Sequence, residues 1–166
     1  RPTVIPALQG ARQIALSQDG RHGCAAMLDG TALCWNALDV PVTPAAVPGL
    51  TGVLQVAVSA GSVSNPLTLE LSAPNACARL ETGWKCWGDN RWGQLATGDY
   101  NEVAAPTDIG ALAMANRLVL SDWYGCLLRE GDVSCWGQNT SDGVSITPVG
   151  TFGAYFPIPI PILIPV

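Results

Sequence analysis

The stretch that decides the fold reads Cys77-Ala-Arg-Leu-Glu-Thr-Gly-Trp-Lys-Cys-Trp-Gly-Asp-Asn-Arg-Trp-Gly-Gln-Leu-Ala-Thr-Gly98. Its two cysteines flank a Glu-Thr-Gly turn signal, which is typical of the tight turn of a β-hairpin. Two further cysteine pairs flank comparable turn signals, with Asp29-Gly30 between Cys24 and Cys34 and Glu130-Gly131 between Cys126 and Cys135. The sequence therefore predicts three β-hairpins, each with a cysteine on both strands.

The third hairpin shows why its cysteines face each other. If Glu130-Gly131 forms a two-residue loop, Arg129 and Asp132 are the first hydrogen-bonded pair. Counting outward, Cys126 and Cys135 fall in a non-hydrogen-bonded pair, whose Cα atoms lie about 4.5 Å apart, within the range of a disulfide. We therefore expect the bonds Cys24–Cys34, Cys77–Cys86 and Cys126–Cys135, each worth at most about 2.5 kcal/mol through chain entropy.

Three local disulfides favour an oxidising compartment, so we expect an extracellular, secreted protein. The alternative is three pairs of buried free thiols in a cytosolic core. Zinc sites fit less well, because paired ligands are usually about two to four residues apart and His22 is the single histidine. Asn139-Thr-Ser141 is a glycosylation sequon, which makes Asn139 a candidate site and agrees with secretion.

The cysteine pairs belong to a longer repeat, because the second cysteines Cys34, Cys86 and Cys135 are 52 and then 49 residues apart. A strand-like segment precedes each hairpin and a proline-containing segment follows it, and this period is typical of propellers. The prediction is an all-β fold of three propeller-like blades of four short antiparallel strands, forming a partial propeller or one completed in an oligomer. A repeat domain, 1–153, would hold repeats at about 11–50, 52–112 and 116–150, with 1–10 matching the end of a preceding blade.

The segment Cys86-Trp-Gly-Asp-Asn-Arg-Trp-Gly-Gln-Leu-Ala-Thr-Gly98 resembles the Trp-Gly-x-Asn-x-x-Gly-Gln-Leu-Gly signature of the regulator of chromosome condensation repeat family. The third copy keeps Cys135-Trp-Gly-Gln-Asn139, and the first keeps only Cys34-Trp-Asn36. The cysteine-bearing hairpins are similar to those of secreted members, some of which act as enzyme inhibitors. The resemblance implies a β-propeller; such propellers usually close with about seven blades. It implies architecture rather than activity, because one fold hosts unrelated functions.

Composition excludes several functional classes. Hydrophobic residues make up 48% of the 166 and charged residues 13%, about half of the usual ~25%, which argues against a disordered chain. A net charge of −5 with 8 Lys+Arg leaves no basic surface for phosphates, so we expect no nucleic-acid partner. No apolar run approaches about 20 residues, so we expect no membrane insertion. Neither a catalytic constellation nor a cofactor or metal motif stands out, and we expect a non-enzymatic protein without cofactors.

Aromatic residues offer candidate binding groups. Trp35, Trp87 and Trp136 recur directly after a cysteine, so we interpret them as blade-packing residues. By contrast, the side chains at Trp92, Trp123 and Tyr124 do not recur, and flat aromatic faces of this kind stack on sugars. We therefore take these three as possible ligand-binding aromatics for a glycan. The second copy also carries an insertion, 61–76, which is a common place for a partner contact.

The C-terminal segment, 154–166, alternates proline with isoleucine. Because side chains alternate in an extended strand, one face would carry all four isoleucines, Ile158, Ile160, Ile162 and Ile164. Such prolines suit an edge strand, and we expect an arm that docks in a groove; the alternative is a linker to another domain.

Two functional hypotheses follow. The first is a secreted structural protein that self-assembles head-to-tail with copies of itself by terminal strand or arm exchange, as an extracellular fibre or surface-layer subunit. The alternative is a secreted propeller-type binding module, lectin-like or inhibitor-like, that recognises a carbohydrate or protein partner.

Overall fold

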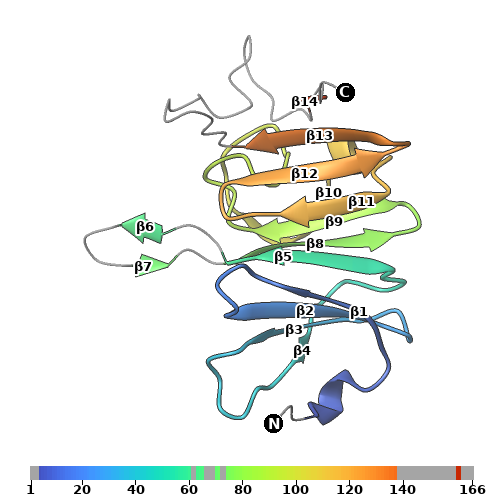
Figure 1. The fold of residues 1–166 in the computed structure, drawn as a ribbon, viewed down its shortest axis with the longest axis vertical. Coiled ribbons are helices and arrows are strands. Elements are labelled where there is room, and N and C mark those ends of the chain that lie inside the picture. Colours follow the sequence, from blue (N-terminus) through green and yellow to red (C-terminus); the bar gives the residue numbers. More distant parts are fainter. Residues whose placement is uncertain (1–3, 61–62, 66–69, 72–73, 138–159, 162–166) are drawn as a thin grey trace.

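The chain forms three four-stranded antiparallel sheets that follow one another along the sequence (Figure 1). This computed structural model describes residues 4–60, 63–65, 70–71, 74–137 and 160–161. Within them, the helical segments are two short 3-10 turns, η1 (Pro6–Leu8) and η2 (Gly110–Leu112). The predicted all-β partial propeller of three four-stranded blades is confirmed.

Each blade is one sheet, and its strands lie side by side in the order of the chain. Blade 1 contains β1 (Ala11–Leu16), β2 (His22–Met27), β3 (Ala32–Asn36) and β4 (Ala45–Ala46). Blade 2 contains β5 (Gln55–Ser59), β8 (Asn75–Leu80), β9 (Gly83–Gly88) and β10 (Val103–Asp108). Blade 3 contains β11 (Arg117–Leu120), β12 (Tyr124–Arg129), β13 (Asp132–Gly137) and β14 (Ile160–Pro161). A separate hairpin, β6 (Val63–Asn65) and β7 (Glu70–Leu71), lies between β5 and β8 in sequence.

The first strands of the three blades, β1, β5 and β11, lie side by side and line a concavity of about 520 Å³. Gln13 of β1 joins two of them, because its Oε1 accepts a hydrogen bond from Val56 N at 2.7 Å and its Nε2 donates to Val56 O at 3.1 Å. A single side chain thus satisfies both main-chain groups of a residue on the neighbouring blade. These strands therefore form the inner wall that the predicted propeller requires.

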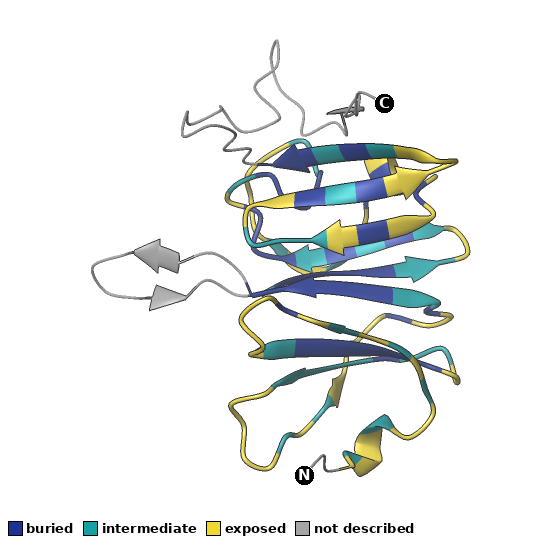
Figure 2. Ribbon diagram, viewed as in Figure 1, coloured by how far each residue is buried: buried dark blue, intermediate teal, exposed yellow. Residues whose placement is uncertain are grey.

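Two apolar cores lie between the blades, and strand alternation assigns each residue to one of them. In β8, Ala76 and Ala78 pack toward blade 1, whereas Cys77 packs toward blade 3. The core between blades 1 and 2 is built mainly of small residues: Cys24, Ala26, Ala32, Leu50, Val53, Val56, Val58, Ala76 and Ala78. The core between blades 2 and 3 includes larger ones: Trp84, Leu95, Ile109, Leu112, Leu118, Leu127 and Trp136. Figure 2 shows the buried residues concentrated on the strands that face a neighbouring blade.

The three cysteine pairs are disulfide-bonded as their spacing predicted. Each pair faces across a hairpin, with Cα atoms 4.1 Å apart in Cys24–Cys34, 4.0 Å in Cys77–Cys86 and 4.1 Å in Cys126–Cys135. The first two bonds lie in the cores between blades. The third lies on the opposite side of blade 3 from Leu127, which packs toward blade 2. The disulfides of blades 1 and 2 therefore face the following blade, and that of blade 3 lies on the corresponding side of its own sheet, away from blade 2.

A tryptophan follows the second cysteine of each hairpin and lies opposite a small residue of the neighbouring strand. The pairs are Gly23 with Trp35, Ala76 with Trp87 and Gly125 with Trp136. A Cβ at Gly125 would lie 2.5 Å from Cζ2 of Trp136, an impossible contact. Glycine is required there because the indole lies flat over the neighbouring backbone.

We therefore predict that Gly125→Ala destabilises the protein. The added methyl group overpacks the site of Trp136, which is 1% exposed, and overpacking costs roughly 1–3 kcal/mol. Urea denaturation followed by tryptophan fluorescence measures the loss. Gly110→Ala is the matched control, because a Cβ at Gly110 meets no atom within 4 Å. Equal stability of the two variants would contradict this packing.

Candidate binding surface

One end of the propeller carries most of the candidate binding residues. In each blade the first strand ends here, the second begins here and the third ends here, as the pairs Leu16/Gly23 and His22/Asn36 show for blade 1. We call this end the loop face and define its described loops as 17–21, 37–44, 89–102 and 121–123. The β6–β7 hairpin projects from this end of blade 2 (Figure 1).

The loop that follows β9 carries the signature residues and is organised around Asn90. This side chain is fully buried, and its Oδ1 accepts a hydrogen bond from Leu95 N at 2.9 Å. Its Nδ2 donates to Thr97 Oγ1 at 2.7 Å and to Asp99 O at 3.0 Å. Asn90 thus supplies hydrogen-bond partners to main-chain groups of this loop, at Leu95 N and Asp99 O, so its role here is structural.

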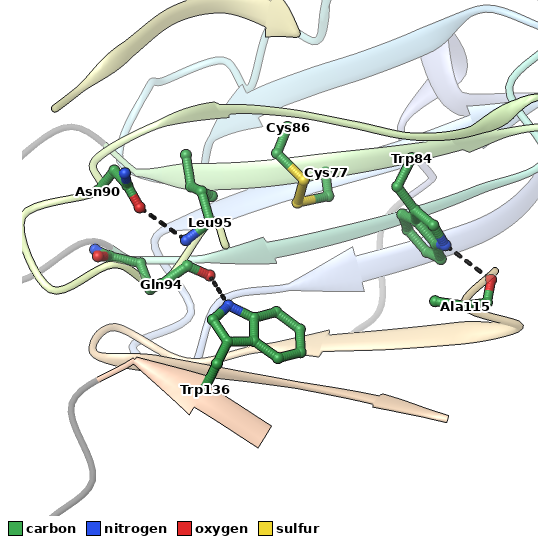
Figure 3. Close-up of a disulfide and its surroundings, with 8 residues drawn as sticks. All are labelled: Cys77, Trp84, Cys86, Asn90, Gln94, Leu95, Ala115 and Trp136. Carbon is green, nitrogen blue, oxygen red and sulfur yellow. Dashed lines mark hydrogen bonds between the residues drawn. A yellow bond between two sulfur atoms is a disulfide. The ribbon is translucent and has the colours of Figure 1, made fainter. Parts of the chain in front are cut away.

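This loop covers the neighbouring blade. Gln94 O accepts a hydrogen bond from Nε1 of Trp136 at 2.9 Å, and Leu95 is fully buried beside it (Figure 3). At the other end of the same core, Nε1 of Trp84 donates to Ala115 O at 2.9 Å. Both indoles in this core are therefore buried and hydrogen-bonded, which leaves neither one available to a ligand.

Asp99 adds an electrostatic contribution to the loop. Burial acts to raise the pKa of Asp99, but hydrogen bonds from Asn101, Thr97 and Asn90 outweigh it and hold the pKa below its ordinary value. Because the folded pKa is the lower one, this stabilisation is present at neutral pH. It is lost as the pH falls through the folded pKa. Across the described residues, no group of three or more His, Cys, Asp or Glu side chains could hold a metal ion.

Of the three predicted ligand-binding aromatics, Trp92 lies in loop 89–102, Trp123 lies in loop 121–123, and Tyr124 is the first residue of β12. Gln94 connects the two loops, because its Oε1 accepts from Trp92 N at 2.9 Å and its Nε2 donates to Asp122 O at 3.3 Å. Trp123 is 47% exposed and Tyr124 45% exposed, whereas Trp92 is half-buried. We call Trp92, Trp123 and Tyr124 the aromatic patch. These residues lie at the loop-face ends of blades 2 and 3, with Tyr124 on the side of blade 3 that faces away from blade 2.

The loop face also contains a pocket that the sequence did not indicate. It has a volume of about 440 Å³, and Trp35 and Trp87 both line it. Both were interpreted as blade-packing residues, yet both are half-buried and Trp87 alone also packs against the core between blades 1 and 2. The signal that could have revealed the pocket is Asn36, which stands where the other two copies have the glycines Gly88 and Gly137.

Several predicted site residues fall outside the described part of the chain. Asn139, the glycosylation candidate, is one, and Ile158, Ile162 and Ile164 of the arm are the others. Ile160 belongs to β14, whose residues pair with β13 of the same chain through Cys135/Ile160 and Ser134/Pro161. The arm thus supplies the fourth strand of blade 3 within its own chain, and its docking on a neighbouring copy remains a prediction.

This geometry defines an RCC1-like β-propeller fold. The solved structure of human WBSCR16 has a TM-score of 0.60 and 17% identity, over 96% of this chain and 42% of that one. Yeast RCC1 (Prp20) bound to Kap60 gives a TM-score of 0.58 and 15% identity, over 92% and 37%. Prp20p from Saccharomyces cerevisiae gives 0.56 and 15%, over 92% and 39%.

The chain thus spans about two fifths of the length of these structures, and at such low identity the likeness shows the fold alone. No protein-family model matches the sequence, and no curated protein matches it. Among the described residues, no helix is long and apolar enough to cross a membrane.

We predict that Asn90→Ala opens the loop over Trp136. The substitution leaves the buried Leu95 N–H without its acceptor, which costs roughly 1–3 kcal/mol. The Trp136 indole should then become accessible to quenchers, as a tryptophan fluorescence titration with acrylamide would show. Asn101→Ala is the control, because Asn101 is exposed and lies outside this contact. Unchanged stability and quenching in Asn90→Ala would contradict the role of Asn90.

Proposed function

We propose that this chain is a non-enzymatic, extracellular propeller-type binding module whose loop face recognises a protein partner. The observation that carries the proposal is the aromatic patch, in which Trp123 and Tyr124 remain about half exposed beside a loop residue, Asp122, that Gln94 holds in place. Exposed aromatic side chains on a rigid support are typical of the residues that contribute most to protein–protein binding.

The three disulfides support the extracellular part of the proposal, because such bonds persist in oxidising compartments. Protein binding is also known for propellers of the same fold: yeast RCC1 (Prp20) has been solved bound to Kap60, and the binding properties of Prp20p to Gsp1p and histones have been studied. Neither partner is carried over to this chain, since the surface loops differ between such distant sequences.

The proposal predicts that Trp123→Ser together with Tyr124→Ser abolishes partner binding without unfolding the blades. A partner would be recovered from the extracellular fraction by photo-cross-linking, purified and remeasured by calorimetry. Removing two aromatic contacts should weaken binding by about a hundredfold or more. Leu28→Ser is the matched control, since Leu28 is 67% exposed at the opposite end of blade 1. Equal losses in both variants, or no loss in either, would contradict the role of the patch.

Self-assembly is a second candidate function, and the outer sides of the end blades favour it. Ile14 and Leu16 of blade 1 are 56% and 58% exposed, and Val119 of blade 3 is 64% exposed. These apolar side chains lie on sheet faces that, in the middle of the molecule, are covered by another blade. We infer that copies could stack head-to-tail through these faces, with β14 exchanged between neighbouring copies.

This second candidate predicts that deleting residues 157–166 leaves the blades folded but unable to associate. Ile160→Asp should also weaken assembly strongly, because it places a charge beside the backbone pairing with Cys135. Sedimentation velocity measures the association, and Pro159→Ala should have a smaller effect. If the truncated protein assembled normally, arm exchange would be wrong; a discrete monomer at all concentrations would favour the binding module instead.

A further inference from the structure

The two boundaries between blades differ in how they treat the repeated tryptophan. At the boundary of blades 2 and 3, Trp136 is 1% exposed and donates to Gln94 O of the preceding blade's loop. At the boundary of blades 1 and 2, Trp87 occupies the same repeat position but is only half-buried. Within the described residues, the Trp87 indole nitrogen has no corresponding hydrogen bond. One boundary is therefore closed and the other open.

The two boundaries differ at the residue that follows the repeated tryptophan in the preceding blade. This residue is Gly88 for the boundary of blades 2 and 3, and Asn36 for the boundary of blades 1 and 2. Gly88 has φ +98°, and a Cβ there would collide with the main chain at Pro74. This conformation directs the following loop over the next blade. The equivalent residue of blade 1 is Asn36, whose Oδ1 instead accepts a hydrogen bond from Leu38 N at 2.9 Å. The loop that follows it, 37–44, therefore folds as a local turn, and Val40 within it is 95% exposed.

The uncovered space is the pocket of about 440 Å³, whose size lies in the range of small-molecule sites, roughly 300–1,000 Å³. Its larger lining residues come from three segments and combine the half-buried Trp87 with several polar groups: His22, Trp35, Asn36, Asp39, Thr43 and Trp87. The rest of the lining is small or already bonded, as the Cys24–Cys34 disulfide is. The pocket thus combines the flat apolar surface of the Trp87 indole with several separate hydrogen-bonding groups.

We propose that this pocket binds a neutral saccharide. A sugar ring presents an apolar C–H face, which stacks on an indole, and a rim of hydroxyl groups, which both donate and accept hydrogen bonds. Asp39 can accept from such hydroxyls, Asn36 Nδ2 can donate to them, and Thr43 can do either. Aromatic surface and polar groups thus match the two chemical aspects of one ligand.

The lining disfavours other ligands. No Lys or Arg lines the pocket and Asp39 carries a negative charge, so phosphorylated or sulfated ligands would bind against that charge. A quaternary ammonium group would suit an indole and a carboxylate. It donates no hydrogen bond, however, and would leave Asn36 and Thr43 unused. The polar groups therefore favour the saccharide over the cation.

This inference goes beyond the proposed function, because the pocket and the aromatic patch are separate sites on the loop face. The two proposals can therefore fail independently. The patch lies at the loop-face ends of blades 2 and 3 and is tested by Trp123 and Tyr124 variants. The pocket lies between blades 1 and 2, and residues of β4 can block it without touching the patch.

The experiment uses the oxidised full chain and three probes, cellobiose, N,N′-diacetylchitobiose and tetramethylammonium, titrated with tryptophan fluorescence as the readout. At least one disaccharide should bind, with a Kd on the order of 1 mM. Ala45→Trp should weaken that binding at least tenfold, because Ala45 is exposed and lines the pocket, so an indole there fills it. Ala46→Trp is the matched control: Ala46 is the adjacent exposed residue of the same strand but does not line the pocket.

Two further variants separate folding from binding. Trp87→Ala should also weaken sugar binding, but it removes an indole that packs against the core and so could act through folding. A loss of binding in this variant therefore supports the pocket only if Ala45→Trp loses binding as well. Asp39→Ala changes an exposed residue and should also weaken binding. The proposal would be overturned if neither disaccharide bound, if Ala45→Trp bound as well as Ala46→Trp, if tetramethylammonium bound more tightly than either sugar, or if Trp123→Ala abolished sugar binding.

Discussion

The burial of one tryptophan between two blades is the interaction on which the rest of this structure depends. Trp136 lies flat over Gly125, within a hairpin that the Cys126–Cys135 bond holds in register, and its indole N–H donates to the loop of the preceding blade. Each part needs the others: without glycine the indole has no space, and without the loop it has no acceptor. Because blades of about fifty residues have little core of their own, these boundaries supply most of the apolar burial.

Hairpin register was predictable from sequence, because disulfide geometry and turn length leave little freedom: Cys126 and Cys135 face each other as a two-residue turn at Glu130-Gly131 requires. The exposure of the tryptophans, by contrast, was not predictable from the sequence. Trp87 and Trp136 occupy the same repeat position, yet their burial depends on the loop of the preceding blade, which is remote from both in sequence. The interpretation of Trp87 as a packing residue was therefore incomplete. The substitution of glycine by Asn36 was visible, but its consequence required three-dimensional placement.

The C-terminal arm shows a different limit of prediction from sequence. Its alternation of proline and isoleucine predicts an edge strand, and β14 pairs with the edge of blade 3. Periodicity determines which groups a strand presents, but it contains no information on whether the partner strand belongs to the same chain or to another. The aromatic patch is a third case: its residues were proposed because they do not recur, whereas the connection between their loops arises from hydrogen bonds of Gln94 with Trp92 and Asp122, which the sequence did not indicate. The fold that this chain shares with distant propellers therefore does not determine its function, which depends on surface loops that differ between them.

The central claim is that one blade boundary is closed over its tryptophan and the other is open. Hydrogen exchange of the indole N–H groups, followed by NMR on the oxidised protein, measures this directly. The account predicts slow exchange at Trp136 and Trp84, whose indoles are buried and hydrogen-bonded, and fast exchange at Trp87. Comparable protection of Trp87 and Trp136 would contradict it, because the pocket between blades 1 and 2 would then be closed in solution.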